Sequence, residues 1–395
     1  MKKIIFCNLD LLRLFSAAKQ YCIDFRQYAD QLCSDGNNLV YFISRDNSSL
    51  KEAQTVLESH GFTQFRYKNR NDVKSFIEQN RQRNNYFVFI SGKEIDFYLA
   101  VNTHSLFIVP TWIPVEKKAQ YYGVPVDHPL QLYNFIRTLN NQQAWYATAT
   151  IDAHTQVLSL IDGKYRYNSL DMNEQNLVKH FELLLKSGTS RSYFNILFYH
   201  FLAGITNSTL LDDIELFGII PSSDCSLNQD MFSFMHQTRY IKGKQIPRNT
   251  PHGENLLLRK KVKNKAHLSH STSERIQMGA IEEFNTLCIN PDFQGKINRL
   301  QKQGRFNVCI FDDYLTHGNS FNAVRNLLET LGVNKIIFIS IGNFGRPFQK
   351  KDYHITGNVY DIGYTYSLID SKEISFRYDN LAKQEVSDLY NIFNS

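Results

Sequence analysis

The sequence lacks any long apolar run. Nowhere in its 395 residues do about 18 consecutive apolar residues occur, the length that a membrane-spanning helix needs. The first residues open like a secretory signal, but polar side chains interrupt the apolar region that such a signal requires, at Asn8, Asp10 and Arg13. We therefore expect neither a membrane span nor a secretory signal, and a cytoplasmic location.

The sequence also lacks a cysteine framework and a strong net charge. Its 6 cysteines form no Cys-x-x-Cys pair and no zinc-like spacing, so we expect reduced thiols. The 44 basic against 38 acidic residues leave a net charge of +6, too little by itself to indicate nucleic-acid binding. With 43% hydrophobic and 21% charged residues, the composition is that of a globular protein and excludes global disorder.

What is present is a pattern of alternating strands and helices. In the first 110 residues, short apolar runs are separated by single amphipathic stretches, which is typical of βαβ units and a parallel sheet. The pattern restarts near residue 147, and a proline-containing connector with one helix lies between. We predict an α/β protein with two doubly wound parallel-sheet domains, 1–145 and 146–395. The expected strands are 3–7, 39–43, 62–67, 86–90, 105–109, 214–220, 306–311, 335–342 and one within 360–366.

The second half contains the most informative motif. Asp312 and Asp313 follow an apolar strand, and a short polar loop then enters a helix. Ligands of open α/β sheets bind at the carboxyl ends of strands, and backbone N–H groups at a helix start suit a phosphate. The two acids would repel a phosphate but could accept hydrogen bonds from ribose hydroxyls. The expected phosphate loop consists of Thr316, His317, Gly318, Asn319 and Ser320.

This motif resembles the binding motif for 5-phosphoribosyl-1-diphosphate (PRPP) in type I phosphoribosyltransferases. His317 stands where the family has a second Thr or Ser, and Asn319-Ser320 stand where Ala-Thr is common. The resemblance implies that Asp312 and Asp313 hold the ribose in a catalytic site. The alternative is an ordinary strand–turn–helix unit capped by a serine.

Two further segments are similar to the ComF-like branch of that family. The loop Pro221-Ser222-Ser223 resembles its pyrophosphate loop, and the basic stretch that starts at Arg259 resembles its flexible hood. Basic side chains could neutralise a pyrophosphate leaving group. The resemblance thus assigns pyrophosphate binding to Pro221, Ser222, Ser223, Arg259, Lys260, Lys261 and Arg275. Alternatively, this basic stretch is a solvated loop or a nucleic-acid patch.

The first half is similar to haloacid dehalogenase-like (HAD) phosphatases. The residues that carry this resemblance follow consecutive strands or open a helix: Asn8, Asp10, Ser44, Lys74 and Asp96. Asn8 replaces the nucleophilic aspartate, and Gly92 replaces one metal-binding acid. We therefore expect a degenerate HAD-like domain without phosphatase activity that binds a ligand or a partner. A generic Rossmann-like domain is the alternative.

Together these resemblances predict a transferase that moves 5-phosphoribosyl from Mg²⁺-bound PRPP to an unidentified nitrogen acceptor. Similar fusions suggest bacterial stress response or phage defence as its context. Protein ligands of the Mg²⁺ and a general base are not evident in the sequence. A non-catalytic PRPP or nucleotide sensor acting through protein or nucleic-acid contacts, a role in DNA handling, and a homo-oligomer are the open alternatives.

Overall fold

The computed structural model describes most of the chain. The described residues are 2–13, 19–35, 38–81, 85–139, 145–164, 175–176, 179, 183, 191–206, 208–263 and 280–394. Arg275, one of the predicted site residues, lies outside the described residues. Most of the segment 177–187, for which the sequence predicts a helix, also lies outside them. No helix in the described ranges has the length and apolar character needed to cross a membrane.

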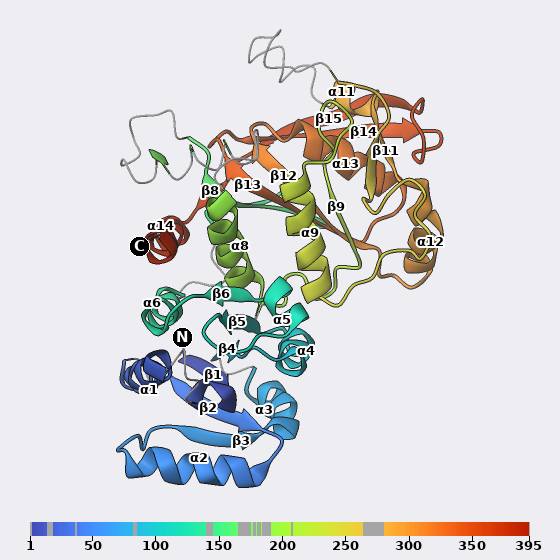
Figure 1. Cartoon of the computed structure of the whole chain (residues 1–395). Helices are drawn as coiled ribbons and strands as arrows, with labels where there is room; N and C mark the ends of the chain where they lie inside the picture. The colour runs from blue at the N-terminus through green and yellow to red at the C-terminus, as the bar shows by residue number, and fades with distance from the viewer. Residues whose placement is uncertain are drawn as a thin grey trace.

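The first sheet is wholly parallel, as its sequence pattern predicts. Its six strands lie in the order β3-β2-β1-β4-β5-β6, and helices follow them on both faces (Figure 1). Its strands are β1 (Lys2–Asn8), β2 (Leu39–Ser44), β3 (Arg66–Asn69), β4 (Asn85–Ile90), β5 (Leu106–Pro110) and β6 (Val124–Val126). Its helices are η1 (Leu9–Leu12), α1 (Lys19–Ser34), α2 (Asn47–Ser59), η2 (Arg70–Asp72), α3 (Val73–Asn80), α4 (Glu94–Asn102), α5 (Lys117–Tyr122) and α6 (Pro129–Thr138).

The second sheet is mixed, which corrects the expectation of a second parallel sheet. Its six strands have the order β16-β7-β8-β13-β12-β9. The four from β8 to β9 pair in parallel, whereas β7 and β16 are antiparallel additions at one edge. A short turn joins β7 directly to β8, and such a connection permits only antiparallel pairing. The strands are β7 (Ala147–Thr150), β8 (Thr155–Asp162), β9 (Leu216–Ile219), β12 (Asn307–Leu315), β13 (Lys335–Asn343) and β16 (Arg377–Tyr378).

Two small antiparallel pairs and several helices complete this part. The strand pairs are β10 (Leu257–Arg259) with β11 (Leu287–Ile289), and β14 (Phe348–Thr356) with β15 (Thr365–Ile374). The helices are α8 (Arg191–Ile205), α9 (Gln229–Ile241), α11 (Ile281–Phe284), η5 (Pro291–Phe293), α12 (Gln294–Lys302), α13 (Asn319–Thr330) and α14 (Asn380–Asn394).

Several boundaries differ from those expected. The strand expected over 62–67 occupies 66–69, and the proline-containing connector holds β6 and the two helices α5 and α6. The strand expected within 360–366 begins only at Thr365. The strand expected over 306–311 continues to Leu315, so the acid pair lies on it and not after it. Backbone pairing with β13 continues past the apolar residues and holds the polar ones extended.

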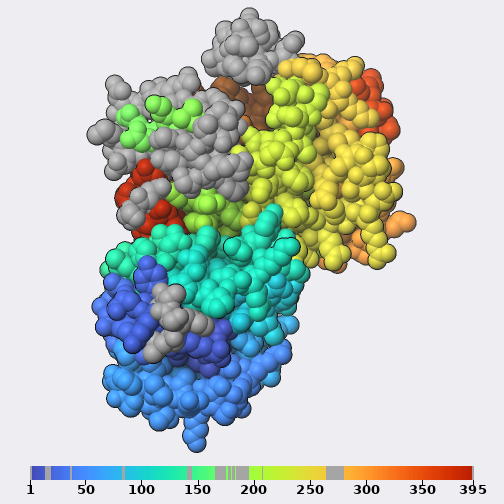
Figure 2. Space-filling model, viewed as in Figure 1, coloured from blue at the N-terminus to red at the C-terminus, as the bar shows by residue number. Residues whose placement is uncertain are grey.

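One hydrophobic cluster spans both sheets. A continuous buried cluster includes Ile5 and Phe42 of the first sheet together with Phe201 and Ile339 of the second part. The hydroxyl of Tyr86 on β4 donates to the Ala203 carbonyl oxygen on α8 at 3.1 Å. The C-terminal helix α14 contacts α6, α8 and β8. Figure 2 shows the two parts in close contact, with the N-terminal part in blue to teal.

Candidate functional site

The candidate site lies where two parallel strands of the second sheet end side by side. Strands β9 and β12 pair with Ile219 opposite Phe311, and the Ile220 N–H donates to the Phe311 carbonyl oxygen at 2.9 Å. The loop that begins at Pro221 therefore leaves the sheet beside Asp312. Pairing between segments about 90 residues apart thus brings the predicted pyrophosphate loop to the predicted ribose-binding acids.

The acid pair carries unfavourable charge. Burial, repulsion from Asp313 and repulsion from Glu283 hold the pKa of Asp312 well above its usual range. The Asp312 carboxylate accepts a hydrogen bond from the Asp313 N–H at 2.9 Å, and Asp313 accepts from the Tyr314 N–H at 2.6 Å. A partner that brings positive charge or hydroxyl donors would relieve this repulsion.

The predicted phosphate loop enters α13 through a left-handed glycine. Gly318 has φ +80°, and a Cβ atom there would lie 2.2 Å from the Phe348 ring, so both conformation and space require glycine. Thr316 is exposed, His317 is buried, and Asn319 and Ser320 begin the helix half-buried. The first-turn N–H groups of a helix lack intrahelical acceptors and suit an anion.

The Pro-Ser-Ser loop is tied to the start of the basic segment. Pro221 is buried and the two serines are half-buried. The Ser222 N–H donates to the Ser226 carbonyl oxygen at 2.9 Å, and the Lys263 N–H donates to the Ser223 carbonyl oxygen at 2.7 Å. The loop is thus folded as a compact turn, with the basic segment fastened across it.

The basic residues divide into one internal and several external cations. The Arg259 side chain is only 2% exposed, and it donates to the Pro221 carbonyl oxygen, to the Thr286 hydroxyl and to Glu283. Arg259 therefore holds the start of the loop in place through the Pro221 carbonyl oxygen. Lys260 pairs with Asp361 at 2.7 Å, and Lys261 is exposed.

Glu283 is a central residue that the sequence analysis missed. Its carboxylate, 1% exposed, lies 2.6 Å from Lys263 Nζ and 2.8 Å from Arg259, and it accepts from the Ser320 hydroxyl at 2.6 Å. Burial alone would raise the pKa of Glu283, but Lys263 and Arg259 lower it to about 2. An internal carboxylate thus engages three groups from the region expected to bind phosphates. No local sequence signal distinguishes Glu283 from its neighbour Glu282.

An aromatic pair flanks the acid pair and was also missed. Tyr314 follows the two acids on β12, and its ring stacks on Phe344 at 5.3 Å between centroids. A Cβ atom at Gly342 would lie 2.4 Å from the Tyr314 ring, so the absence of a side chain there lets the ring lie against the sheet. The Tyr314 ring is therefore held by Gly342 and Phe344, directly after the acid pair in sequence.

The predicted HAD-like residues converge only in part. Asp96 is buried and accepts from the Asn8 amide and the Ser91 hydroxyl, each at 2.6 Å. The guanidinium of Arg70 binds the same carboxylate, also at 2.6 Å. Since Asn8, Ser91 and Arg70 occupy both oxygens of Asp96, this carboxylate is neutralised by the protein itself. Arg70 and Ser91 were not singled out from the sequence.

The other predicted HAD-like residues lie in different surroundings. Asp10 pairs with Arg13 at 3.2 Å and with Lys93 at 3.4 Å. Ser44 ends β2, one position beyond the residue that pairs with Asn8, and its hydroxyl accepts from the Asp46 N–H. Lys74 is 57% exposed and pairs with Glu78 at 3.9 Å. The cation beside the buried acid is thus Arg70, from the turn before α3, and not Lys74.

Among the described residues, no group of three or more His, Cys, Asp or Glu side chains could hold a metal ion. Comparison with protein-family models, with curated proteins and with solved structures found no significant match to this chain.

Proposed function

We propose that the protein binds Mg²⁺-PRPP between the Pro221 loop and α13 and transfers its 5-phosphoribosyl group to a nitrogen acceptor. The observation that carries the proposal is the parallel pairing of β9 and β12, which brings an acid pair, a serine loop and a helix start to one sheet edge. Each of these suits a different part of the ligand: hydroxyls, diphosphate and terminal phosphate.

Acidic, neutral and basic residues of the site bind different parts of PRPP. Asp312 and Asp313 accept hydrogen bonds from the ribose hydroxyls, and the start of α13 binds the 5′-phosphate. The Ser222–Ser223 turn and the exposed cations Lys260 and Lys261 face the diphosphate. Arg259 acts indirectly, because it is buried and holds the Pro221 carbonyl oxygen.

Mg²⁺ fits this donor set only together with the ligand. Carboxylate oxygens are the hard ligands that Mg²⁺ prefers, and the raised pKa of Asp312 indicates negative charge that a cation would stabilise. Asp312 and Asp313 are the protein residues that would hold the ion, and it would neutralise charge on the leaving diphosphate.

In the proposed reaction, the acceptor nitrogen forms a bond to C1′ as the bond between C1′ and the diphosphate oxygen breaks, and its electron pair leaves with the diphosphate. The acceptor nitrogen loses its proton to solvent or to a group that we do not assign.

Asp312→Asn tests the proposal. We expect at least tenfold weaker binding of Mg²⁺-PRPP in calorimetry, since a charged acceptor of ribose hydroxyls is lost. Because the folded-state pKa of Asp312 is raised, its ionised form opposes folding above its unfolded pKa, so the variant should unfold at a higher temperature than the wild type at pH 7. Greater stability with weaker binding separates a site residue from a structural one.

Glu52→Gln, an exposed carboxylate on α2, is the matched control and should change neither quantity. Wild-type protein that shows no saturable binding of Mg²⁺-PRPP would refute the proposal. If the wild type and Asp312→Asn bound Mg²⁺-PRPP with equal affinity, Asp312 would not take part in binding the ribose.

A non-catalytic PRPP sensor is the second candidate, and the Glu283 network favours it. The hydroxyl of Ser320 and the guanidinium of Arg259 are already bound to an internal carboxylate, so fewer donors are open to a transition state than the motif suggests. Incubation with PRPP, Mg²⁺ and a pool of bases and nucleosides distinguishes the two. Release of pyrophosphate supports transfer, and saturable binding without release across the pool supports the sensor.

For the first half we propose a binding role without hydrolysis. Asn8 cannot form an aspartyl-phosphate, and Asp96 is neutralised by Arg70. We expect no hydrolysis of p-nitrophenyl phosphate with Mg²⁺ above that of a buffer blank. Turnover by the wild type that disappears in Asp10→Ala would contradict this expectation.

A further inference from the structure

Exposed aromatic side chains gather where the first part of the chain meets the second. Tyr98 on α4 and Tyr121 on α5 are 39% and 58% exposed. The Tyr122 ring lies parallel to the Tyr240 ring of α9, with 4.0 Å between the ring centroids, and the Tyr121 ring meets Tyr122 edge-on at 4.7 Å. Figure 1 shows α5 beside the lower end of α9. We call this surface the tyrosine patch: Tyr98, Tyr121, Tyr122 and Tyr240.

A basic side chain lies on the tyrosine patch. Lys118 Nζ is 5.0 Å from the centre of the Tyr98 ring and donates to the hydroxyl of the same residue. Hydrogen bonds with the hydroxyls of Tyr98 and Tyr240 raise the pKa of Lys118, so this cation is close to rings from both parts of the chain. The patch therefore combines exposed aromatic area with positive charge, and such rings attract cations and stack on other rings.

Basic residues continue from the tyrosine patch, past the C-terminal end of α9 and onto α12. Lys244 Nζ lies 3.1 Å from the Glu215 carboxylate, and Arg305 binds the same carboxylate. Lys296 Nζ on α12 donates to the Glu215 carbonyl oxygen at 3.3 Å. Cations from three segments of the chain thus meet at one acidic residue. We call these cations and their two basic neighbours the basic group: Arg239, Lys244, Lys296, Arg299 and Arg305.

The positive charge of the basic group is only partly compensated. Among the described residues, Glu215 and Glu254 are the only acids that form ion pairs with it, and Glu254 lies 3.8 Å from Arg239. Burial and the nearby charges of Arg299 and Arg239 lower the pKa of Lys296 to about 8. An anionic partner would stabilise the charged form of this lysine and relieve the repulsion among its neighbours.

We propose that the tyrosine patch and the basic group together bind single-stranded nucleic acid. Its phosphates pair with the cations, and its unpaired bases stack on the exposed tyrosine rings. An acidic protein would use the cations but gain little from the rings, and a duplex keeps its bases stacked on one another. Glu215 and Arg305 precede β9 and β12, whereas the proposed PRPP site follows both strands. The two sites therefore lie at opposite ends of these strands, and this proposal does not depend on PRPP binding.

The double variant Arg299→Gln, Arg305→Gln tests the basic group, and it should fold normally because both side chains are exposed. In fluorescence anisotropy at low salt, the wild type should bind a labelled oligothymidylate of about 20 nucleotides saturably. The double variant should bind at least tenfold more weakly. Its dependence of log affinity on log salt should be shallower by about 1.4, since each phosphate contact to a single strand contributes about 0.7. Lys51→Gln, Lys372→Gln removes two exposed cations elsewhere and should change neither quantity.

Tyr121→Leu tests the stacking. It should weaken binding of the oligothymidylate about tenfold and leave the salt dependence unchanged, because a stacked base releases no counterion. The duplex of the same strand with oligodeoxyadenylate should bind more weakly than the single strand, and Asp312→Asn should bind the single strand like the wild type. A wild type without saturable binding, or a double variant with wild-type affinity, would overturn the proposal. Wild-type affinity of Tyr121→Leu would also overturn it and indicate an acidic protein as the partner, and a duplex that binds as tightly as the single strand would indicate double-stranded nucleic acid instead.

Discussion

We expect Glu283→Gln to lower the free energy of unfolding by about 3–5 kcal/mol at pH 7. The carboxylate is 1% exposed and lies within 2.8 Å of both Arg259 and Lys263. The amide keeps the shape of the side chain but leaves two cations, one of them fully buried, without an anion. Chemical denaturation in urea measures the loss.

The dependence of this loss on pH follows from the pKa of Glu283. The folded protein lowers it from 4.5 to about 2, so the ionised carboxylate stabilises the fold by about 3 kcal/mol. That contribution is complete above about pH 4.5 and decreases as the pH falls toward 2. The difference in stability between the wild type and Glu283→Gln should therefore be constant near neutral pH and shrink in acid.

Glu282→Gln is the matched control, because Glu282 precedes Glu283 on the same helix and is half-buried. Its stability should remain within about 0.5 kcal/mol of the wild type. Added pyrophosphate should raise the unfolding temperature of Glu283→Ala more than that of the wild type, since the anion can replace the missing carboxylate. A loss below about 1 kcal/mol for Glu283→Gln would show that the cations do not depend on this residue.

A structural feature of this protein could be predicted from the sequence when residues close together along the chain determine it. The run Phe306–Phe311 followed by Asp312 and Asp313 predicts a strand that ends in acids, and the small residues after it predict a turn into a helix. These features depend on neighbours along the chain, and the structure contains each of them, with the strand extended to Leu315. The parallel pairing of the first sheet was also predicted, from the alternation of strands and helices.

Features that depend on long-range contacts were not predictable. Glu283 acts on residues 20 to 37 positions away in sequence, and nothing in its own segment indicates this. The same holds for Arg70, which reaches Asp96 while Lys74 points to solvent. A single helix turn separates these two cations, so the spacing along the chain alone does not decide which of them faces the site.

The antiparallel edge of the second sheet was likewise not predictable from the pattern of strands and helices. The segment of β7 was not among the expected strands, and its close connection to β8 determines the direction of pairing. The alternation of strands and helices therefore predicts the α/β class. To predict that the second sheet is mixed, one would also need to know the geometry of the turn between β7 and β8.

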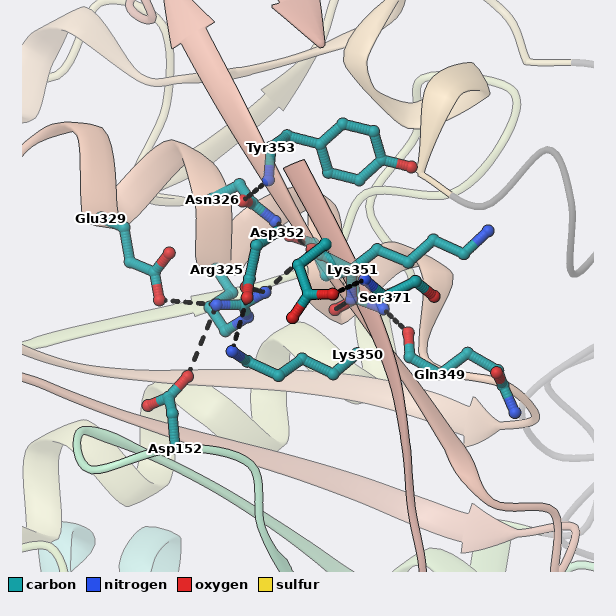
Figure 3. A network of polar contacts seen from close by, with 12 residues as sticks. Asp152, Arg325, Asn326, Glu329, Gln349, Lys350, Lys351, Asp352, Tyr353 and Ser371 are labelled. Carbon is teal, nitrogen blue, oxygen red and sulfur yellow. Dashed lines mark hydrogen bonds and ion pairs between the residues drawn. The ribbon is translucent and has the colours of Figure 1, made fainter. Parts of the chain in front are cut away.

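A buried arginine fixes the helix on which the proposed phosphate site depends. Arg325 on α13 is 1% exposed and binds three carboxylates, Asp152, Glu329 and Asp352, at 3.4, 2.7 and 2.5 Å. Figure 3 shows these acids and the backbone of β14 around its guanidinium. Burial raises the pKa of Glu329, so this acid in particular depends on the nearby positive charge.

Arg325→Met should therefore lower the free energy of unfolding by about 3–5 kcal/mol, because three carboxylates lose the cation between them. Arg325→Lys should lose less, since it keeps the charge but lacks the planar fork that reaches several acceptors at once. Both variants should also weaken binding of Mg²⁺-PRPP, because α13 is held against β14 by this network and its first turn forms the proposed phosphate site.

Urea denaturation measures the stability, and Arg299→Met, which replaces an exposed arginine on α12, should stay within about 0.5 kcal/mol of the wild type. The deficit of Arg325→Met should decrease as the pH falls, because protonation of Glu329, whose pKa burial raises, removes negative charge from the cluster. Arg325→Met with wild-type stability at pH 7 would mean that the three acids are solvated well enough to need no counter-charge. A destabilised variant with undiminished PRPP affinity would instead separate the packing of α13 from ligand binding.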